Sequence, residues 1–289
     1  KEIVILVDCS SEVWPQVKLN GFYLSFKNSE VGTLPPTQIN RLRQILEDEE
    51  ISKITHDFKT LLIALKENHI EIKGKVFDTL LAAYLLDPAK VNFSLEELSW
   101  EYLGSYSNMQ LDETAKTDAV FKLKPILEAQ LKEKELLELF FKVEMPLAAV
   151  LAGMELKGVK IDTGVLKELS VKMQTRTQEL IEKIYALAQE EFNINSPKQL
   201  SRILFEKLKL PVVKKTKTGV STDEEVLNKL ASQHPLPAML LEYRQLVKLT
   251  STYIDALPEL INPSTGRVHT SFNQTGTETG RLSSSSPNL

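Results

Sequence analysis

The chain has 289 residues, of which 42% are hydrophobic and 26% charged, an ordinary composition for a globular protein of more than one domain. A single cysteine, Cys9, excludes an internal disulfide framework, and four histidines without a second cysteine give no zinc-site spacing. Because the sequence has neither a cleavable leader nor a long uninterrupted apolar run, we expect a soluble protein of the reducing cytoplasm with no membrane partner.

The formal net charge of -4 is unevenly distributed along the chain. Residues 151–289 carry 18 Lys and Arg against 15 Asp and Glu, whereas residues 1–150 carry 17 against 24. The imbalance is sharpest in residues 193–219, where Glu206 faces these basic residues: Lys198, Arg202, Lys207, Lys209, Lys214, Lys215 and Lys217. Such clustering is typical of phosphate contact, and a solvated lysine-rich face is the simpler alternative.

The first half of the chain alternates between two periodicities. β-branched and alternating apolar residues predict strands at 3–7, 21–26, 53–55 and 75–77. Helical spacing predicts helices at 38–46, 57–67 and 78–86, the last of which ends at Asp87-Pro88. This alternation favours an α/β domain.

Helical patterns dominate from residue 119 onward, with a domain boundary expected at Pro146. Asp162 or Thr163 is a suitable cap for a helix of about 25 residues, or roughly 35 to 40 Å. Its apolar stripe is interrupted near Arg176 and consists of Leu166, Leu169, Met173, Leu180, Ile184 and Leu187. A narrow stripe of this kind needs an antiparallel partner, which we expect at 237–257. A turn at 263–266 and a strand-like segment at 267–272 follow.

Several motifs are more specific than these patterns. Residues 277–289, TETGRLSSSSPNL, place a glycine before Arg281 and follow it with four serines and a Pro-Asn turn. Taken alone, the stretch is consistent with a polar surface turn. Together with GVKID (158–162), FNINSPKQL (192–200), EYRQL (242–246), STYID (251–255) and RVHTSFNQ (267–274), it resembles the family A DNA polymerases of the bacterial DNA polymerase I type. The segment 76–88, VFDTLLAAYLLDP, is similar to the exonuclease-type domain that precedes the polymerase in that family.

The resemblance covers essentially the whole chain and implies three segments. Residues 1–145 would form an α/β, ribonuclease H-like 3′-5′ exonuclease-type domain, residues 146–262 a mainly helical thumb, and residues 263–289 the truncated start of an α+β palm. We therefore expect a monomeric template-directed polymerase that binds primer-template DNA and deoxynucleoside triphosphates and acts in replication and repair.

The resemblance also implies DNA contacts. Arg281 would reach the minor-groove face at the primer terminus, where every base pair presents similar acceptors. Asn288 would lie near the template, and Lys248 beside the duplex. The remaining expected contacts are Asn195, Ser196, Lys198, Lys214, Lys215, Lys217 and, more weakly, Gln274.

The catalytic carboxylates of the family are expected outside these residues. The polymerase uses divalent metal, expected to be Mg²⁺, held by carboxylates that this sequence does not contain, so the segment alone is predicted to be inactive. In the exonuclease-type domain, Asp8 matches the first acidic position, but Ser10 stands at the second and Leu61 at the third, with nearby Asp57 as the alternative for the third. Asp118 matches the last acidic position, with Thr114 in place of its tyrosine. We therefore expect a degenerate exonuclease domain.

Two alternatives belong to other functional classes. The chain could be a non-catalytic DNA-binding fragment or accessory protein, which duplex binding without extension would indicate. It could instead be an active 3′-5′ exonuclease, which metal-dependent loss of single-stranded 3′ ends would indicate.

Overall fold

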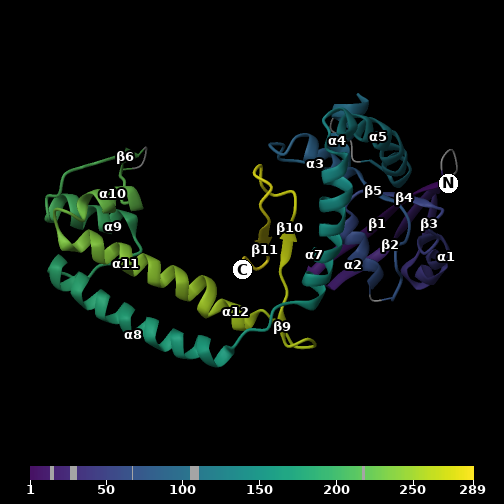
Figure 1. Cartoon of the computed structure of the whole chain (residues 1–289). Helices are drawn as coiled ribbons and strands as arrows, with labels where there is room; N and C mark the ends of the chain where they lie inside the picture. Colours follow the sequence, from purple (N-terminus) through teal and green to yellow (C-terminus); the bar gives the residue numbers. More distant parts are fainter. Residues whose placement is uncertain (14–15, 27–30, 67, 105–110, 217–218) are drawn as a thin grey trace. The chain divides into compact units, whose positions relative to one another are not determined.

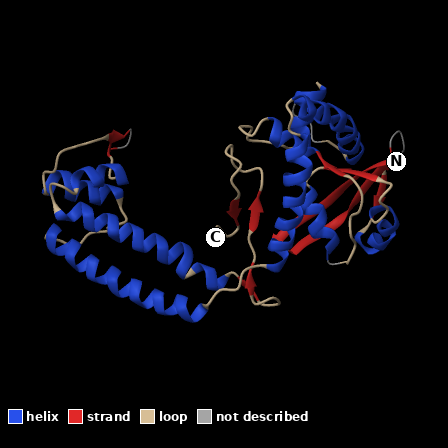
Figure 2. Cartoon of the chain, viewed as in Figure 1, coloured by secondary structure: helices blue, strands red, loops and turns tan. Residues whose placement is uncertain are grey.

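The computed structural model describes residues 1–13, 16–26, 31–66, 68–104, 111–216 and 219–289. They form two compact units, one of residues 1–159 with 269–289 and one of residues 160–268 (Figure 1). The five-stranded sheet belongs to the first unit, and the second is mainly helical (Figure 2). This agrees with the expected α/β and helical halves. No helix within the described ranges is long and apolar enough to cross a membrane.

The sheet of the first unit has the order β3-β2-β1-β4-β5. Strands β1 (Glu2–Val13), β2 (Gln16–Phe26) and β3 (Gly32–Leu34) are antiparallel, whereas β4 (Ser52–Thr55) and β5 (Val76–Asp78) run parallel to β1. All four expected strands are confirmed. The parallel pairs require crossover connections, and the helices between them supply these connections.

Helices pack on this sheet and bury its apolar side chains. They are the 3₁₀ helix η1 (Pro36–Leu42), α1 (Arg43–Leu46), α2 (Phe58–Lys66), α3 (Thr79–Leu86), α4 (Leu95–Leu103) and α5 (Glu113–Glu133). Asp78, Ser94 and Asp112 cap α3, α4 and α5 by accepting hydrogen bonds from backbone N–H groups of the first turn. Helix α4 was not among the expected helices.

The boundary expected at Pro146 lies inside a continuous helical segment. Helix α6 (Leu137–Leu139) continues through the π-helical turn η2 (Phe140–Glu144) into α7 (Met145–Lys157). Pro146 follows the π-helical turn η2, in which the N–H of Met145 bonds to the carbonyl of Phe140 five residues back, and this irregular turn accommodates a residue that has no N–H to donate. Helix α7 packs against α2, so the first compact unit extends to Val159. The two compact units therefore have other boundaries than the three expected segments. The functional roles of those segments remain a prediction.

A helical hairpin organises the second unit. Helix α8 (Thr163–Ala188) has 26 residues and is capped by Asp162, as expected. Its partner is α11 (Pro235–Leu249), followed by the π-helical turn η4 (Thr250–Ile254) and α12 (Ala256–Glu259).

The apolar stripe of α8 is buried over one half only. Leu180 and Ile184 pack into a core with Leu240 of α11, whereas the earlier apolar residues of the stripe stay partly exposed. At the expected interruption, the Arg176 guanidinium donates to the Glu242 carboxylate on α11, with N–O distances of 2.7 and 2.9 Å. The polar interruption is thus a contact between the two helices.

Shorter elements complete the second unit. They are α9 (Pro197–Ser201), the π-helical turn η3 (Arg202–Lys207), β6 (Lys215–Thr216), β7 (Gly219–Val220), α10 (Glu224–Leu230), β8 (Ile261–Asn262) and β9 (Arg267–Val268). Strands β6 and β7 pair, as do β8 and β9 around the turn expected at 263–266.

Residues 269–289 form the second part of the first unit, and we call them the terminal segment. Within it, β10 (Ser271–Asn273) pairs with β11 (Ser283–Ser285) in antiparallel register. The serine run is therefore largely a strand, and residues 274–282 form the loop of a hairpin.

Candidate nucleic-acid interface

The terminal segment leaves Arg281 and Asn288 exposed. The Thr277 hydroxyl donates to the Arg281 carbonyl at 2.7 Å, which fixes the backbone of Arg281 and leaves its guanidinium available. Asn288 accepts a hydrogen bond from the Ser284 hydroxyl at 3.1 Å, so its amide NH₂ can still donate. Both residues can therefore donate hydrogen bonds to a ligand outside the protein.

Gln274 differs from its expected role as a DNA contact. Its side chain is buried, with 7% of the residue exposed. Its Nε2 donates to the carbonyl of Glu144 at 2.9 Å and to the Glu144 carboxylate at 2.5 Å. Because the amide already satisfies buried acceptors, Gln274 stabilises the position of the terminal segment and has no free donor for DNA.

A buried ion pair fixes β10 to the helices of the first unit. The Lys59 ammonium on α2 lies 2.8 Å from the carboxylate of Glu155 on α7, which is fully buried. Both groups also bind the backbone of Phe272: Lys59 donates to its carbonyl at 2.5 Å, and its N–H donates to Glu155 at 2.7 Å. Burial raises the pKa of Glu155, while the Lys59 contact opposes that rise. The pair thus provides hydrogen-bond partners inside the protein for the carbonyl and the N–H of Phe272 in β10.

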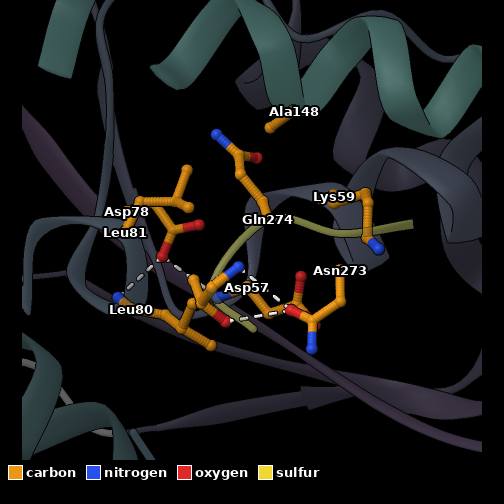
Figure 3. Close-up of a pocket in the computed structure, with 9 residues that line it drawn as sticks. Asp57, Lys59, Asp78, Leu80, Leu81, Ala148, Asn273 and Gln274 are labelled. Carbon is orange, nitrogen blue, oxygen red and sulfur yellow. Dashed lines mark hydrogen bonds between the residues drawn. The ribbon is translucent and has the colours of Figure 1, made fainter. Parts of the chain in front are cut away.

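A cavity of about 80 Å³ lies beside this anchor, between the helices and the terminal segment (Figure 3). Asp57, Lys59 and Asp78 line it together with Asn273 and Gln274 of the terminal segment. Asp78 accepts backbone N–H bonds from residues 57, 58 and 80 at 3.1, 2.7 and 2.8 Å. Burial nevertheless raises the pKa of Asp78 to about 7, because the charged form loses its hydration.

The second unit has a broad open depression of about 860 Å³ that includes two of the expected contact residues. Ser196 and Lys198 line it together with Arg244 of α11. Ser196 caps α9 by accepting from the Gln199 N–H, and Lys198 is exposed. Asn195 is also exposed, and its amide donates to the Tyr243 hydroxyl at 3.2 Å. The depression combines hydroxyl groups and cations, the donors that phosphate oxygens accept from, with the carboxylates of Glu206 and Asp223.

The basic residues of 193–219 are not equally available. Lys214 lies 2.9 Å from Asp223 and 3.8 Å from Glu225, and its hydrogen bond is the largest cause that lowers the pKa of Asp223 to about 2. Arg202 and Lys207 both pair with Glu190. The acidic partners of these three residues are Glu190, Asp223 and Glu225, which lie outside the basic segment 193–219.

The other expected lysines are less constrained. Lys215 on β6 and Lys248 on α11 are exposed, and the described residues provide no ion-pair partner for either. The expected contact Lys217 lies outside the described residues. Among the expected contacts, Lys198, Lys215, Lys248 and Arg281 are thus exposed cations that remain available for an anion.

The four exonuclease positions do not form an acidic cluster. Asp8 accepts from the Tyr23 hydroxyl at 3.0 Å and from the Asn20 amide at 3.2 Å. Leu61 is fully buried in the core, and Asp118 is exposed on α5 in an ion pair with Lys122 at 2.6 Å. Thr114 is exposed on the same helix, and Ser10 is placed by its backbone pairing with residue 18 of β2.

A cleft of about 480 Å³ remains beside Asp8, lined also by Tyr23, His56, Glu113 and Lys116. The Tyr23 hydroxyl binds both Asp8 and Glu113, and burial is the first cause that raises the pKa of Tyr23 to about 12. A protonated phenol therefore donates to Oδ2 of Asp8, while the Asn20 amide donates to Oδ1. Within the described part of the chain, no group of three or more His, Cys, Asp or Glu is arranged to hold a metal ion. This donor set does not fit the two-metal site of a proofreading exonuclease, which needs several carboxylates.

Three contributing residues were not evident from the sequence. Tyr23 and Asn20 satisfy Asp8, but β1 and β2 had to be paired before either could be placed. Arg244 stands within the quoted EYRQL motif, and its guanidinium donates to the Thr222 carbonyl at 2.6 Å. The EYRQL motif drew attention to this arginine, but the sequence did not show that it contacts Thr222.

Comparison with known proteins covers both halves of the chain. The family model for DNA polymerase family A matches residues 163–289, and the model for the ribonuclease H-like domain of DNA polymerase I matches residues 7–115. DNA polymerase I of Geobacillus stearothermophilus is 44% identical over 265 residues, which cover 84% of this chain and 30% of that protein. DNA polymerase I of Caldicellulosiruptor bescii is 38% identical over 295 residues, covering 100% of this chain and 34% of that protein.

A solved structure gives the same result. The POL domain of Pol1 from M. smegmatis, in complex with DNA primer-template and dNTP, has a TM-score of 0.86 and 30% identity, covering 100% of this chain and 52% of that one. The chain spans about a third of the length of the curated relatives it matches. From these matches and the ribonuclease H-like sheet described above, we conclude that the chain belongs to the family A DNA polymerases, of the DNA polymerase I type.

Proposed function

We propose that this chain holds primer-template DNA for a template-directed DNA polymerase that extends a primer with deoxynucleoside triphosphates in replication and repair. Residues 146–262 would act as the thumb, residues 263–289 as the start of the palm, and residues 1–145 as a scaffold derived from an exonuclease. The protein would act as a monomer in the cytoplasm.

The observation that carries this proposal is the availability of Lys198, Lys248 and Arg281. All three are exposed, and no ion-pair partner for them lies within the described ranges, whereas Lys214 is neutralised by neighbouring acids. Exposed lysines bind phosphates without reading sequence, which suits an enzyme that must accept any template. An arginine in the minor groove can check base-pair geometry through acceptors that all pairs share.

Asn195 and Ser196 support the same assignment at the backbone of the duplex. They lie next to Lys198 at the start of α9, and Ser196 and Lys198 line the same depression as Arg244. Each offers a short polar group that can donate to a phosphate oxygen. Lys214 and Lys215 would add charge near this surface, with Lys214 contributing less because of its acidic partners. Lys217, which lies outside the described residues, stays a contact expected from the sequence.

Membership of this polymerase family implies divalent metal use, and we infer that the metal is Mg²⁺. Bound metal would activate the primer hydroxyl and stabilise the leaving pyrophosphate. The carboxylates that hold it in this family are absent from these 289 residues. The residues described here would bind and orient the duplex.

The alternative of an active 3′-5′ exonuclease receives no support from the cleft beside Asp8. Leu61 supplies no ligand, and Asp118 is paired with Lys122 on the surface of α5. The other alternative, a non-catalytic DNA-binding protein, differs from our proposal only in whether extension occurs. One experiment therefore separates them.

The test is primer extension by the full-length protein on a matched primer-template with Mg²⁺ and all four deoxynucleotides. Duplex affinity is measured on the same preparation by fluorescence anisotropy over a range of salt concentrations. Extension supports the proposal, and salt-dependent binding without extension supports the non-catalytic alternative. A protein that neither binds the duplex nor extends the primer would contradict both.

A further inference from the structure

The exonuclease-like part of the first unit holds the hairpin loop that carries Arg281. This loop, residues 274–282, is fixed at its two ends by the pairing of β10 with β11, in which Asn273 lies opposite Ser283. Gln274 binds Glu144 at the start of the loop. The pairing and this bond fix the ends of the loop and leave its central residues to be held by other contacts.

Tyr84 of α3 supplies such a contact. Its hydroxyl donates to the carbonyl of Thr277 at 2.9 Å, across 193 residues of sequence. The Thr277 hydroxyl in turn donates to the carbonyl of Arg281 at 2.7 Å. Two consecutive hydrogen bonds therefore connect a helix of the exonuclease-like domain to the backbone of the arginine.

The Tyr84 ring cannot move freely to another partner. The residue is 3% exposed, and its ring packs edge to face on Phe93, with the centroids 5.9 Å apart. A buried aromatic ring in such contacts keeps its hydroxyl in one direction. Gly280, with φ of +73°, then turns the chain so that Arg281 leaves the loop toward solvent.

We propose that Tyr84 is a positioning residue for the polymerase, acting through Thr277 to hold Arg281 at the primer terminus. The inference rests on the proposed function, because it requires Arg281 to contact the duplex. It gives the degenerate exonuclease domain a specific task in extension. It also predicts that losing one hydroxyl in that domain changes how the polymerase responds to its primer terminus.

The test is Tyr84→Phe in the full-length protein, measured by single-turnover extension from matched and mismatched primer termini. We expect matched extension to slow by about threefold to tenfold, as for one hydrogen bond that fixes a contact made in the transition state. The ratio of mismatched to matched extension should rise, and duplex affinity should change by less than about twofold, because phosphate contacts dominate binding.

Combination with Arg281→Ala separates positioning from general destabilisation. If Tyr84 acts through Arg281, Tyr84→Phe has no further effect on extension when Arg281 is already alanine. Thr277→Val, which removes the second hydrogen bond, should give the same pattern. Additive effects in the double variants would overturn the proposal.

Tyr102→Phe is the matched control, because Tyr102 is a half-buried tyrosine of the same domain that packs against the same core. We expect it to leave matched extension and the mismatch ratio unchanged. An equal effect of Tyr102→Phe and Tyr84→Phe would contradict a specific role of Tyr84.

If the Arg281→Ala variant alone extends the primer normally, the role assigned to Arg281 in the proposed function fails. If Arg281→Ala is impaired and Tyr84→Phe is normal, the inference on Tyr84 fails alone.

Discussion

The cleft beside Asp8 and the loop that carries Arg281 lie in the same compact unit, but they use their polar groups differently. At the cleft, Tyr23 and Asn20 satisfy the Asp8 carboxylate inside the protein. In the loop, the protein satisfies backbone carbonyls and leaves the Arg281 side chain exposed. A position that resembles a family site is therefore a candidate for ligand binding only when its functional atoms remain available.

The largest expected effect comes from an attempt to restore the acidic cleft at Leu61. Leu61→Asp places a carboxylate at a fully buried position, so we expect the free energy of unfolding to fall by roughly 3 to 5 kcal/mol. The measurement is urea denaturation, with Leu61→Met as a control that keeps the apolar volume. We expect no gain of exonuclease activity. A stable variant that degrades single-stranded DNA with divalent metal would show that the cleft still supports a metal site.

A pH-dependent effect is expected at Asp78, where the terminal segment meets the helices of the first unit. The pKa of Asp78 is raised to about 7 from 3.8, so between these values the unfolded chain releases a proton that the folded protein keeps. The contribution of Asp78 to stability is therefore lost as pH rises, by about 1.4 kcal/mol per pH unit and on the order of 4 kcal/mol in all.

Asp78→Asn isolates this contribution. The free energy of unfolding of the natural protein minus that of the variant should fall as pH rises from about 4.5 to 7.5, because the aspartate titrates and the asparagine does not. Denaturant unfolding at several pH values within that window measures it. A difference that stays constant would mean that the three backbone N–H bonds outweigh burial and keep Asp78 ionised.

A smaller effect, on rate, is expected for Arg281→Ala in the full-length protein. We expect extension to slow by about tenfold to a hundredfold while duplex affinity changes by less than threefold, because one minor-groove contact serves the transition state more than overall binding. Single-turnover extension and anisotropy give the two quantities. Equal losses of rate and affinity would indicate an ordinary binding contact.

The smallest expected effects distinguish available lysines from a paired one. Lys198→Ala and Lys248→Ala should each lower the slope of log affinity against log salt by about 1, as for one lost phosphate contact. Lys214→Ala should change it less, because Asp223 and Glu225 already neutralise that ammonium. Neutralising Lys214, Lys215 and Lys217 together should weaken binding to all sequences. An unchanged slope in that triple variant would mean that the loop does not contact DNA.

Sequence periodicity was sufficient for the strands at the start of the chain and for the long helix capped by Asp162. It was insufficient for α4 and for the boundary at Pro146. Both failures have a physical cause. Short helices depend on tertiary packing more than on their own pattern, and the π-helical turn before Pro146 lets the helix continue past a proline.

The sequence by itself determined the family resemblance, the order of the segments, and the presence of Ser10 and Leu61 where the resemblance implies carboxylates, because these depend on residue identity. Tertiary structure decided which polar groups remain available. Gln274 and Lys214 are occupied by Glu144 and Asp223, while Arg281 is supported by Tyr84 from a distant helix. Such partners are separated in sequence and meet only after folding, so local pattern does not reveal them.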